Sequence, residues 1–157
     1  MTQDNQTTTS LSSVVFENLK ELLKAKNAAH ESIFKFHWKK LPPFNLIWPQ
    51  VDFLRIIRLM GELEKHAEEQ KIFINKNLSK ATEKELPFFK AIPDYLDALV
   101  VSCRALTEIA QFKQDKLEKK EGRSVFSFSK LLTSYEKAQD QLVRKGAFVQ
   151  VHWMEIN

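Results

Sequence analysis

Residues 93–117 read PDYLDALVVSCRALTEIAQFKQDKL and carry an apolar stripe at the spacing of an α-helix. The stripe consists of Tyr95, Leu96, Leu99, Ser102, Cys103, Leu106, Ile109, Ala110 and Leu117. Its small members, Ser102, Cys103 and Ala110, would let a neighbouring helix come close. We predict a helix that begins at Pro93, a residue that suits the first helical turn, and continues to about Lys119.

Similar stripes before this segment predict two more long helices. The first is expected to have Ser12 or Ser13 as its N-cap and to end at about Leu41, because Pro42 and Pro43 follow. The second is expected over about residues 51–78. Its apolar positions again recur at helical spacing.

A fourth helix is predicted after the charged turn that follows Lys119. Ser127 or Ser129 would cap its N-terminus, and Gly146 would mark its C-terminal stop. Residues 148–153 alternate in polarity like a strand, but they also fit a continued helix. Both assignments stay open from the sequence.

These stripes together predict an all-α fold, an antiparallel bundle of about four long helices. Thr82 and Glu85 match a capping box, which predicts a short extra helix between the second and third long helices. The chain has only three glycines and none of the Asn-Gly or Asp-Gly pairs that tight hairpin turns use. Residues 1–10 are polar and without period, so we expect a disordered tail followed by a single helical domain over residues 11–157.

Composition argues against several kinds of chemistry. Cys103 is the one cysteine, so it forms no disulfide within the chain and builds no cysteine zinc site alone. The glycines are too far apart for a phosphate-binding loop, and no histidine belongs to the Glu-x-x-His motif of di-iron bundles. We therefore predict no catalytic residues and no cofactor. The longest uncharged apolar run, residues 98–103, is too short to cross a bilayer, and we expect a cytoplasmic protein.

Charge gives little support for nucleic acid as a partner. The chain has 24 basic and 20 acidic residues, a net charge of +4, and the two signs are interspersed. A nucleic-acid surface requires clustered positive charge. The segment 35–40, with its lysines and aromatic residues, is the nearest approach to such a cluster.

Two histidines interrupt the apolar stripe of the first helix. His30 and His37 are seven residues apart and so lie on one helix face, two turns from each other. A buried imidazole needs hydrogen-bond partners. One interpretation is a divalent-metal site or a polar pocket completed from the second helix, by Glu62, Glu69 or His66. The simpler one is a pair of core or boundary histidines bonded to hydroxyl groups or backbone carbonyls.

The connection after the first helix is unusually apolar and is bracketed by prolines. Trp38 precedes it, and it contains Phe44, Ile47 and Trp48. Such a segment either folds over the end of the bundle as a hydrophobic cap or docks onto a partner. The alternatives stay open from the sequence.

The function expected from these features is that of a non-enzymatic protein–protein interaction module. Its partner would be another protein or a second copy of the chain in a homodimer, bound through Trp38, Phe44, Ile47 and Trp48. The alternative is a metal-binding four-helix bundle that uses His30 and His37 with carboxylates of the second helix.

Overall fold

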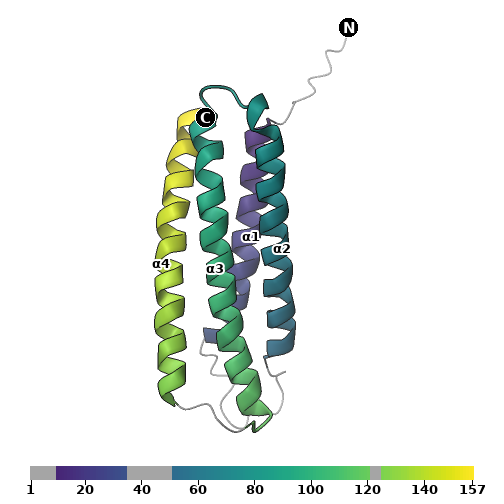
Figure 1. The fold of residues 1–157 in the computed structure, drawn as a ribbon, viewed down its shortest axis with the longest axis vertical. Helices are drawn as coiled ribbons and strands as arrows, with labels where there is room; N and C mark the ends of the chain where they lie inside the picture. The colour runs from purple at the N-terminus through teal and green to yellow at the C-terminus, as the bar shows by residue number, and fades with distance from the viewer. Residues whose placement is uncertain (1–9, 35–50, 121–124) are drawn as a thin grey trace.

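The computed structural model describes residues 10–34, 51–120 and 125–157, and all regular structure in these ranges is helical. The long helices are α1 (Leu11–Phe34), α2 (Phe53–Asn77), α3 (Leu86–Leu117) and α4 (Val125–Ile156). They run alternately down and up the molecule, and a short 3₁₀ helix, η3 (Leu78–Lys80), directly follows α2 (Figure 1). The predicted antiparallel bundle of four long helices is confirmed. No described helix has an apolar stretch that would span a bilayer.

The N-terminus of α1 is capped by Ser10, two residues before the earlier of the two predicted caps. Its hydroxyl oxygen accepts a hydrogen bond from the backbone N–H of Ser13 at 3.2 Å. Ser12 is buried, and its hydroxyl donates to Glu85 at the start of α3 over 2.7 Å. The assignment of Ser12 or Ser13 as the N-cap was wrong, because a contact with another helix uses the Ser12 hydroxyl. The predicted end at Leu41 lies outside the described residues.

The start of α3 also differs from the prediction. The helix begins at Leu86, with Pro87 in its first turn, and Pro93 lies in the interior of the helix. The predicted capping box is present, since the Glu85 N–H donates to the Thr82 hydroxyl and the Glu85 carboxylate accepts from the Thr82 N–H. It opens α3 and not a separate short helix. Burial of Phe88, Phe89 and Ile92 holds the turns before Pro93 in place.

Helix α4 continues through Gly146 and through residues 148–153, where the sequence left its C-terminal end open. Gly146 lies inside the helix and does not stop it, and residues 148–153 are helical. A Cβ at Gly146 would lie 3.3 Å from Cε2 of Tyr95 on α3. This glycine therefore marks a close approach between two helices, a property that the local sequence does not reveal.

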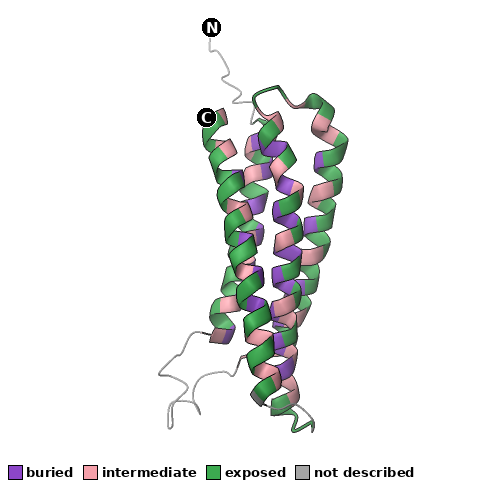
Figure 2. Cartoon of the chain, turned by 60° about the vertical axis from the view of Figure 1, so that its left-hand side comes forward, coloured by how far each residue is buried: buried purple, intermediate pink, exposed green. Residues whose placement is uncertain are grey.

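Helix α3 is central to the core. It packs against both α2 and α4, while α1 packs against α2 and α3. Buried residues lie mainly on the inward faces of the helices and exposed residues on the outward faces (Figure 2). An aromatic cluster joins α1, α3 and α4 at one end of the bundle, where Phe16 stacks on Trp153 with ring centroids 4.2 Å apart and Phe88 contacts both rings.

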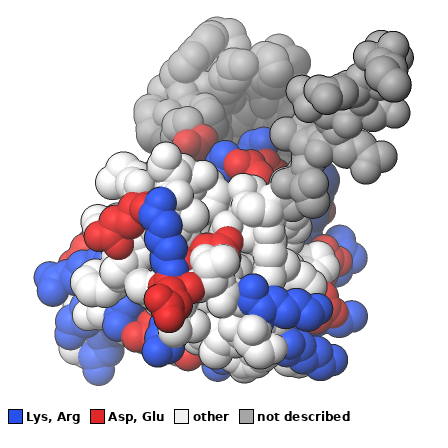
Figure 3. All heavy atoms as spheres, turned by 90° about the horizontal axis from the view of Figure 1, so that it is seen from above, with Lys and Arg blue, Asp and Glu red and all other residues white. Residues whose placement is uncertain are grey.

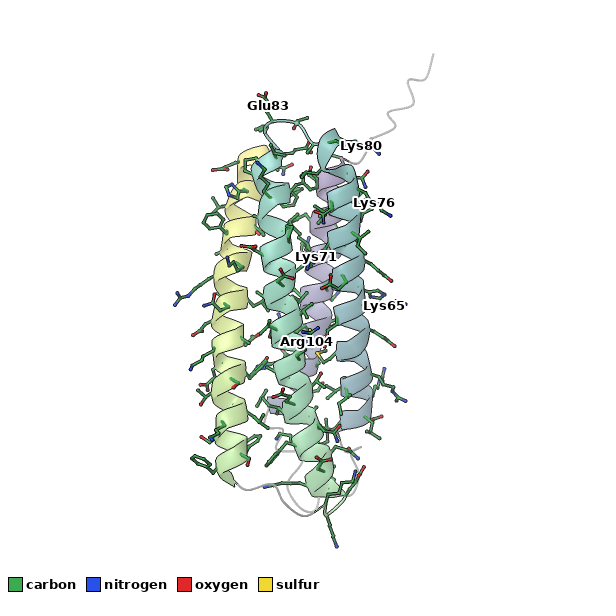
Figure 4. All side chains as sticks on the ribbon, viewed as in Figure 1. Lys65, Lys71, Lys76, Lys80, Glu83 and Arg104 are labelled. Carbon is green, nitrogen blue, oxygen red and sulfur yellow. The ribbon has the colours of Figure 1, made fainter. Side chains whose placement is uncertain are left out.

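Charged side chains on the surface are mixed in sign. In the end-on view, basic and acidic side chains alternate over the described part of that face (Figure 3). Lys71 of α2 and Arg104 of α3 form ion pairs across the two helices, with Asp97 at 2.6 Å and Glu64 at 2.9 Å (Figure 4). Exposed pairs of this kind contribute little stability each.

Glu85→Ala should lower the free energy of unfolding by about 0.5–2 kcal/mol, because it removes the capping box. The hydrogen bond from Ser12, followed by those from Thr82, lowers the pKa of the Glu85 carboxyl below its ordinary value. The stabilisation is therefore present above that ordinary value and is lost as the pH falls through the folded-state pKa. Urea unfolding at pH 7 and under acid conditions measures both effects. Glu83→Ala is the control, with an expected change within about 0.5 kcal/mol at both pH values, and an equal effect of the two substitutions would contradict the prediction.

Candidate functional site

The structure places His30 at a contact between α1 and α4. Its Nδ1 lies 2.8 Å from the hydroxyl of Tyr135, and its ring contacts those of Phe34 and Tyr135 at centroid distances of 4.9 and 5.6 Å. Burial, with the nearby charge of Lys26 second, lowers the pKa of His30. The imidazole has a hydroxyl partner, as the simpler sequence interpretation expected.

The structure places Glu62 and His66, two of the other predicted metal ligands, apart from the contact of His30 with Tyr135. Glu62 and His66 are exposed on α2 and line a shallow groove that α2 forms with α1. No three histidine, cysteine or acidic side chains in the described ranges are grouped to hold a metal ion. His37 lies outside those ranges, as do the predicted interface residues Trp38, Phe44, Ile47 and Trp48.

The most unusual side chain of the site is Lys26 on α1, which is completely buried. Its ammonium group donates a hydrogen bond to the side-chain oxygen of Gln139 on α4 and lies 5.1 Å from the ring centre of Tyr135. Burial lowers the pKa of Lys26 to about 8, so the group is largely protonated at neutral pH. A buried lysine without a carboxylate partner is rare, since desolvation of an unpaired charge is costly.

Helix α3 completes this polar cluster. The Ser102 hydroxyl donates to the same Gln139 oxygen at 2.8 Å, so two donors share one acceptor. Burial raises the pKa of the Cys103 thiol to about 12 and keeps it protonated. Lys26 forms no ion pair with any acidic residue in the part of the chain that the structure describes. The cluster is therefore rich in donors and holds an unbalanced positive charge.

Sequence reasoning missed Lys26, although a signal was present. Lys26 lies seven residues after Leu19 and seven before Ile33, so it sits on the apolar stripe of α1. Lysines near an apolar stripe usually extend their ammonium group into water. The ammonium group of Lys26 instead donates to Gln139 of α4, which the local sequence does not show.

A groove separates α1 from α4 beside this cluster. Its volume is about 390 Å³, and Tyr95 and Gln139 contribute to its wall. The remaining lining is mostly apolar and includes Leu19, Leu23, Leu142 and Val149. One end of the groove approaches the Phe16–Trp153 stack, and the polar cluster lies behind Gln139.

The C-terminal half of α4 carries a second notable surface, which we call the α4 stripe. Val143, Ala147, Val151 and Met154 follow one another at helical spacing and are all exposed, with 66% of Val143 and 61% of Met154 accessible to solvent. Residues 146–154 contain no Asp, Glu, Lys or Arg. Such a stripe on an outward helix face is typical of an interaction surface.

In comparisons with known proteins, no family model, curated protein or solved structure matches this chain. Function must therefore be inferred from the α4 stripe and from the groove with its polar cluster.

Proposed function

We propose that this protein is a non-enzymatic interaction module that self-associates through the α4 stripe. The supporting observation is the alignment of Val143, Ala147, Val151 and Met154 on the exposed side of α4. The opposite side of the helix, with Tyr135, Leu142 and Val149, is buried in the core. A helix that is apolar on both sides gains stability when its second side is also covered.

A second copy suits this stripe because the stripe is self-complementary. In an isologous contact the same residues come from both copies. If two α4 helices cross antiparallel at the small residue Ala147, Val143 of one copy faces Val151 of the other, since both are four residues from the crossing point. Lys137 and Glu155 lie on one flank of the stripe, and this register places them across the contact within about 3 Å along the axis, two residues of helical rise.

Val151→Glu should convert the dimer into a monomer, because it places one carboxylate of each copy within the apolar contact. The change buries no charge in the monomer, where Val151 is 49% exposed. Sedimentation velocity across a dilution series measures the monomer–dimer equilibrium, and we expect a rise of at least tenfold in the dimer dissociation constant.

Val101→Glu is the matched control for this experiment. Val101 lies on α3, is 54% exposed, and stands outside the α4 stripe. We expect this variant to dimerise like the wild type. A wild-type protein that stays monomeric at high micromolar concentration would refute self-association, as would equal effects of the two substitutions.

A further inference from the structure

The groove between α1 and α4 has the dimensions of a small-molecule site. Its volume of about 390 Å³ falls within the range of ligand pockets, about 300–1,000 Å³. The groove follows α4 from Gln139 to Gln150, a length of about 16 Å at 1.5 Å per residue. It is long, narrow and mostly apolar, which favours an extended aliphatic chain.

The charge around the groove is positive. Among the described residues that line it, Lys20 alone is charged. The Lys26 ammonium group lies behind Gln139, whose side-chain oxygen accepts from both Lys26 and Ser102. Two donors, one of them charged, thus share one neutral acceptor at a wall of the groove.

An ionised carboxylate is the chemical group that fits these donors. It offers two oxygens with several acceptor positions, whereas the Gln139 amide offers one oxygen. It would also supply the negative charge that a buried ammonium group requires. Gln139 is only partly buried and lines the groove, so its side chain can rotate outward and leave both donors to a ligand.

We infer that this groove binds a single-chain fatty acid, with its carboxylate on Lys26 and Ser102 and its chain along Leu19, Leu23, Leu142 and Val149. The Phe16–Trp153 stack would limit the length of the chain. Val143 borders the groove and also belongs to the α4 stripe, whereas the proposed head-group donors, Lys26 and Ser102, lie outside the stripe.

Calorimetric titration of the full chain with dodecanoate and with dodecanol, at a concentration below that at which either aggregates, tests the inference. The two ligands share the chain and differ in the charged head group. We expect dodecanoate to bind at least tenfold more tightly than dodecanol. In Lys26→Met this preference should disappear while the circular dichroism spectrum is retained. Binding of neither ligand, or equal binding of both by the wild type, would overturn the inference.

Gln139→Glu gives a second and independent test. This substitution places a carboxylate of the protein itself beside Lys26 and Ser102, so it should compete with the ligand and weaken dodecanoate binding at least tenfold. Gln141→Glu is the matched control, since it makes the same change in charge on an exposed position of α4 outside the groove. We expect the control to bind like the wild type. Unchanged dodecanoate affinity in Gln139→Glu would refute the assignment of Lys26 as the head-group residue.

Discussion

Lys26→Met is expected to raise the free energy of unfolding by about 3 kcal/mol at pH 7. Burial lowers the pKa of Lys26 from the ordinary 10.5 to about 8, and a shift of this size corresponds to about 3 kcal/mol of destabilisation at neutral pH. Methionine fills a similar volume without a charge, and replacing buried charges with apolar groups often stabilises a protein. Gln139 keeps its hydrogen bond from Ser102 in the variant. Urea unfolding followed by circular dichroism measures the difference.

The gain in unfolding free energy expected for Lys26→Met should depend on pH. Between pH 8 and 10.5 the unfolded chain still holds a proton on Lys26 that the folded chain has released. The unfolded state binds more protons in this window, so the contribution of Lys26 makes stability rise with pH. Below pH 8 the full penalty is present. The advantage of Lys26→Met should therefore be greatest at and below pH 7 and decline towards pH 10.5.

Other buried groups act in the opposite direction at high pH. Burial raises the pKa values of Cys103 and Tyr95 to about 12 and also raises the pKa of Tyr135. In the folded state these groups keep protons that the unfolded chain loses, so their contribution to stability falls as the pH rises above their ordinary values. They remain in the variant, and the difference between variant and wild type largely removes their effect.

Lys20→Met is the control for the substitution at Lys26. Lys20 lies on the same helix, but 54% of its side chain is exposed, so we expect a change within about 0.5 kcal/mol. A lower free energy of unfolding in Lys26→Met would contradict the prediction. It would mean that the contacts of Lys26 with Gln139 and Tyr135 outweigh the cost of burying its charge.

Phe88→Ala is expected to lower the free energy of unfolding by about 3–5 kcal/mol, the usual range for a buried aromatic residue reduced to alanine. Phe88 is completely buried, and its ring contacts those of Phe16 on α1, Phe89 on α3 and Trp153 on α4 at centroid distances of 6.3, 5.4 and 5.5 Å. The substitution would leave a cavity where three helices meet. Chemical denaturation measures the loss.

Phe126→Ala is the matched control, because it removes the same aromatic ring at a position that is 70% exposed. We expect the free energy of unfolding to change by no more than about 0.5 kcal/mol there. A loss in Phe88→Ala as small as that of the control would show that the cluster of Phe16, Phe88 and Trp153 does not hold the end of the bundle together.

Local rules of sequence reading misplaced the start of α3 and the end of α4. Pro93 was expected to begin α3 and Gly146 to end α4, and both lie inside helices. The Thr82–Glu85 capping box starts α3 earlier, and Gly146 accommodates the ring of Tyr95. At Gly146 the contact with Tyr95 outweighed a local preference of about 1 kcal/mol. At the start of α3 the capping box acted together with the burial of Phe88, Phe89 and Ile92.

The candidate site shows the same division between local and distant information. The sequence drew attention to His30 but did not reveal that Tyr135 is its partner. It placed Lys26 on the apolar stripe of α1 but did not show that Gln139 is its partner. Glu62 and His66 were plausible companions because they lie on the next helix. They face a different groove, so the structure does not bring them to His30.

The amino-acid sequence by itself determined that this chain forms long helices and buries one face of each, because helical periodicity and the scarcity of glycine are properties of the chain alone. The tertiary structure decided which polar side chains meet. Lys26 donates a hydrogen bond to Gln139, which lies 113 positions away in the chain. The same Gln139 oxygen accepts from Ser102, which lies 76 positions from Lys26. Such a meeting depends on the rotation and axial offset of whole helices, which are set by packing throughout the core and not by the residues that meet.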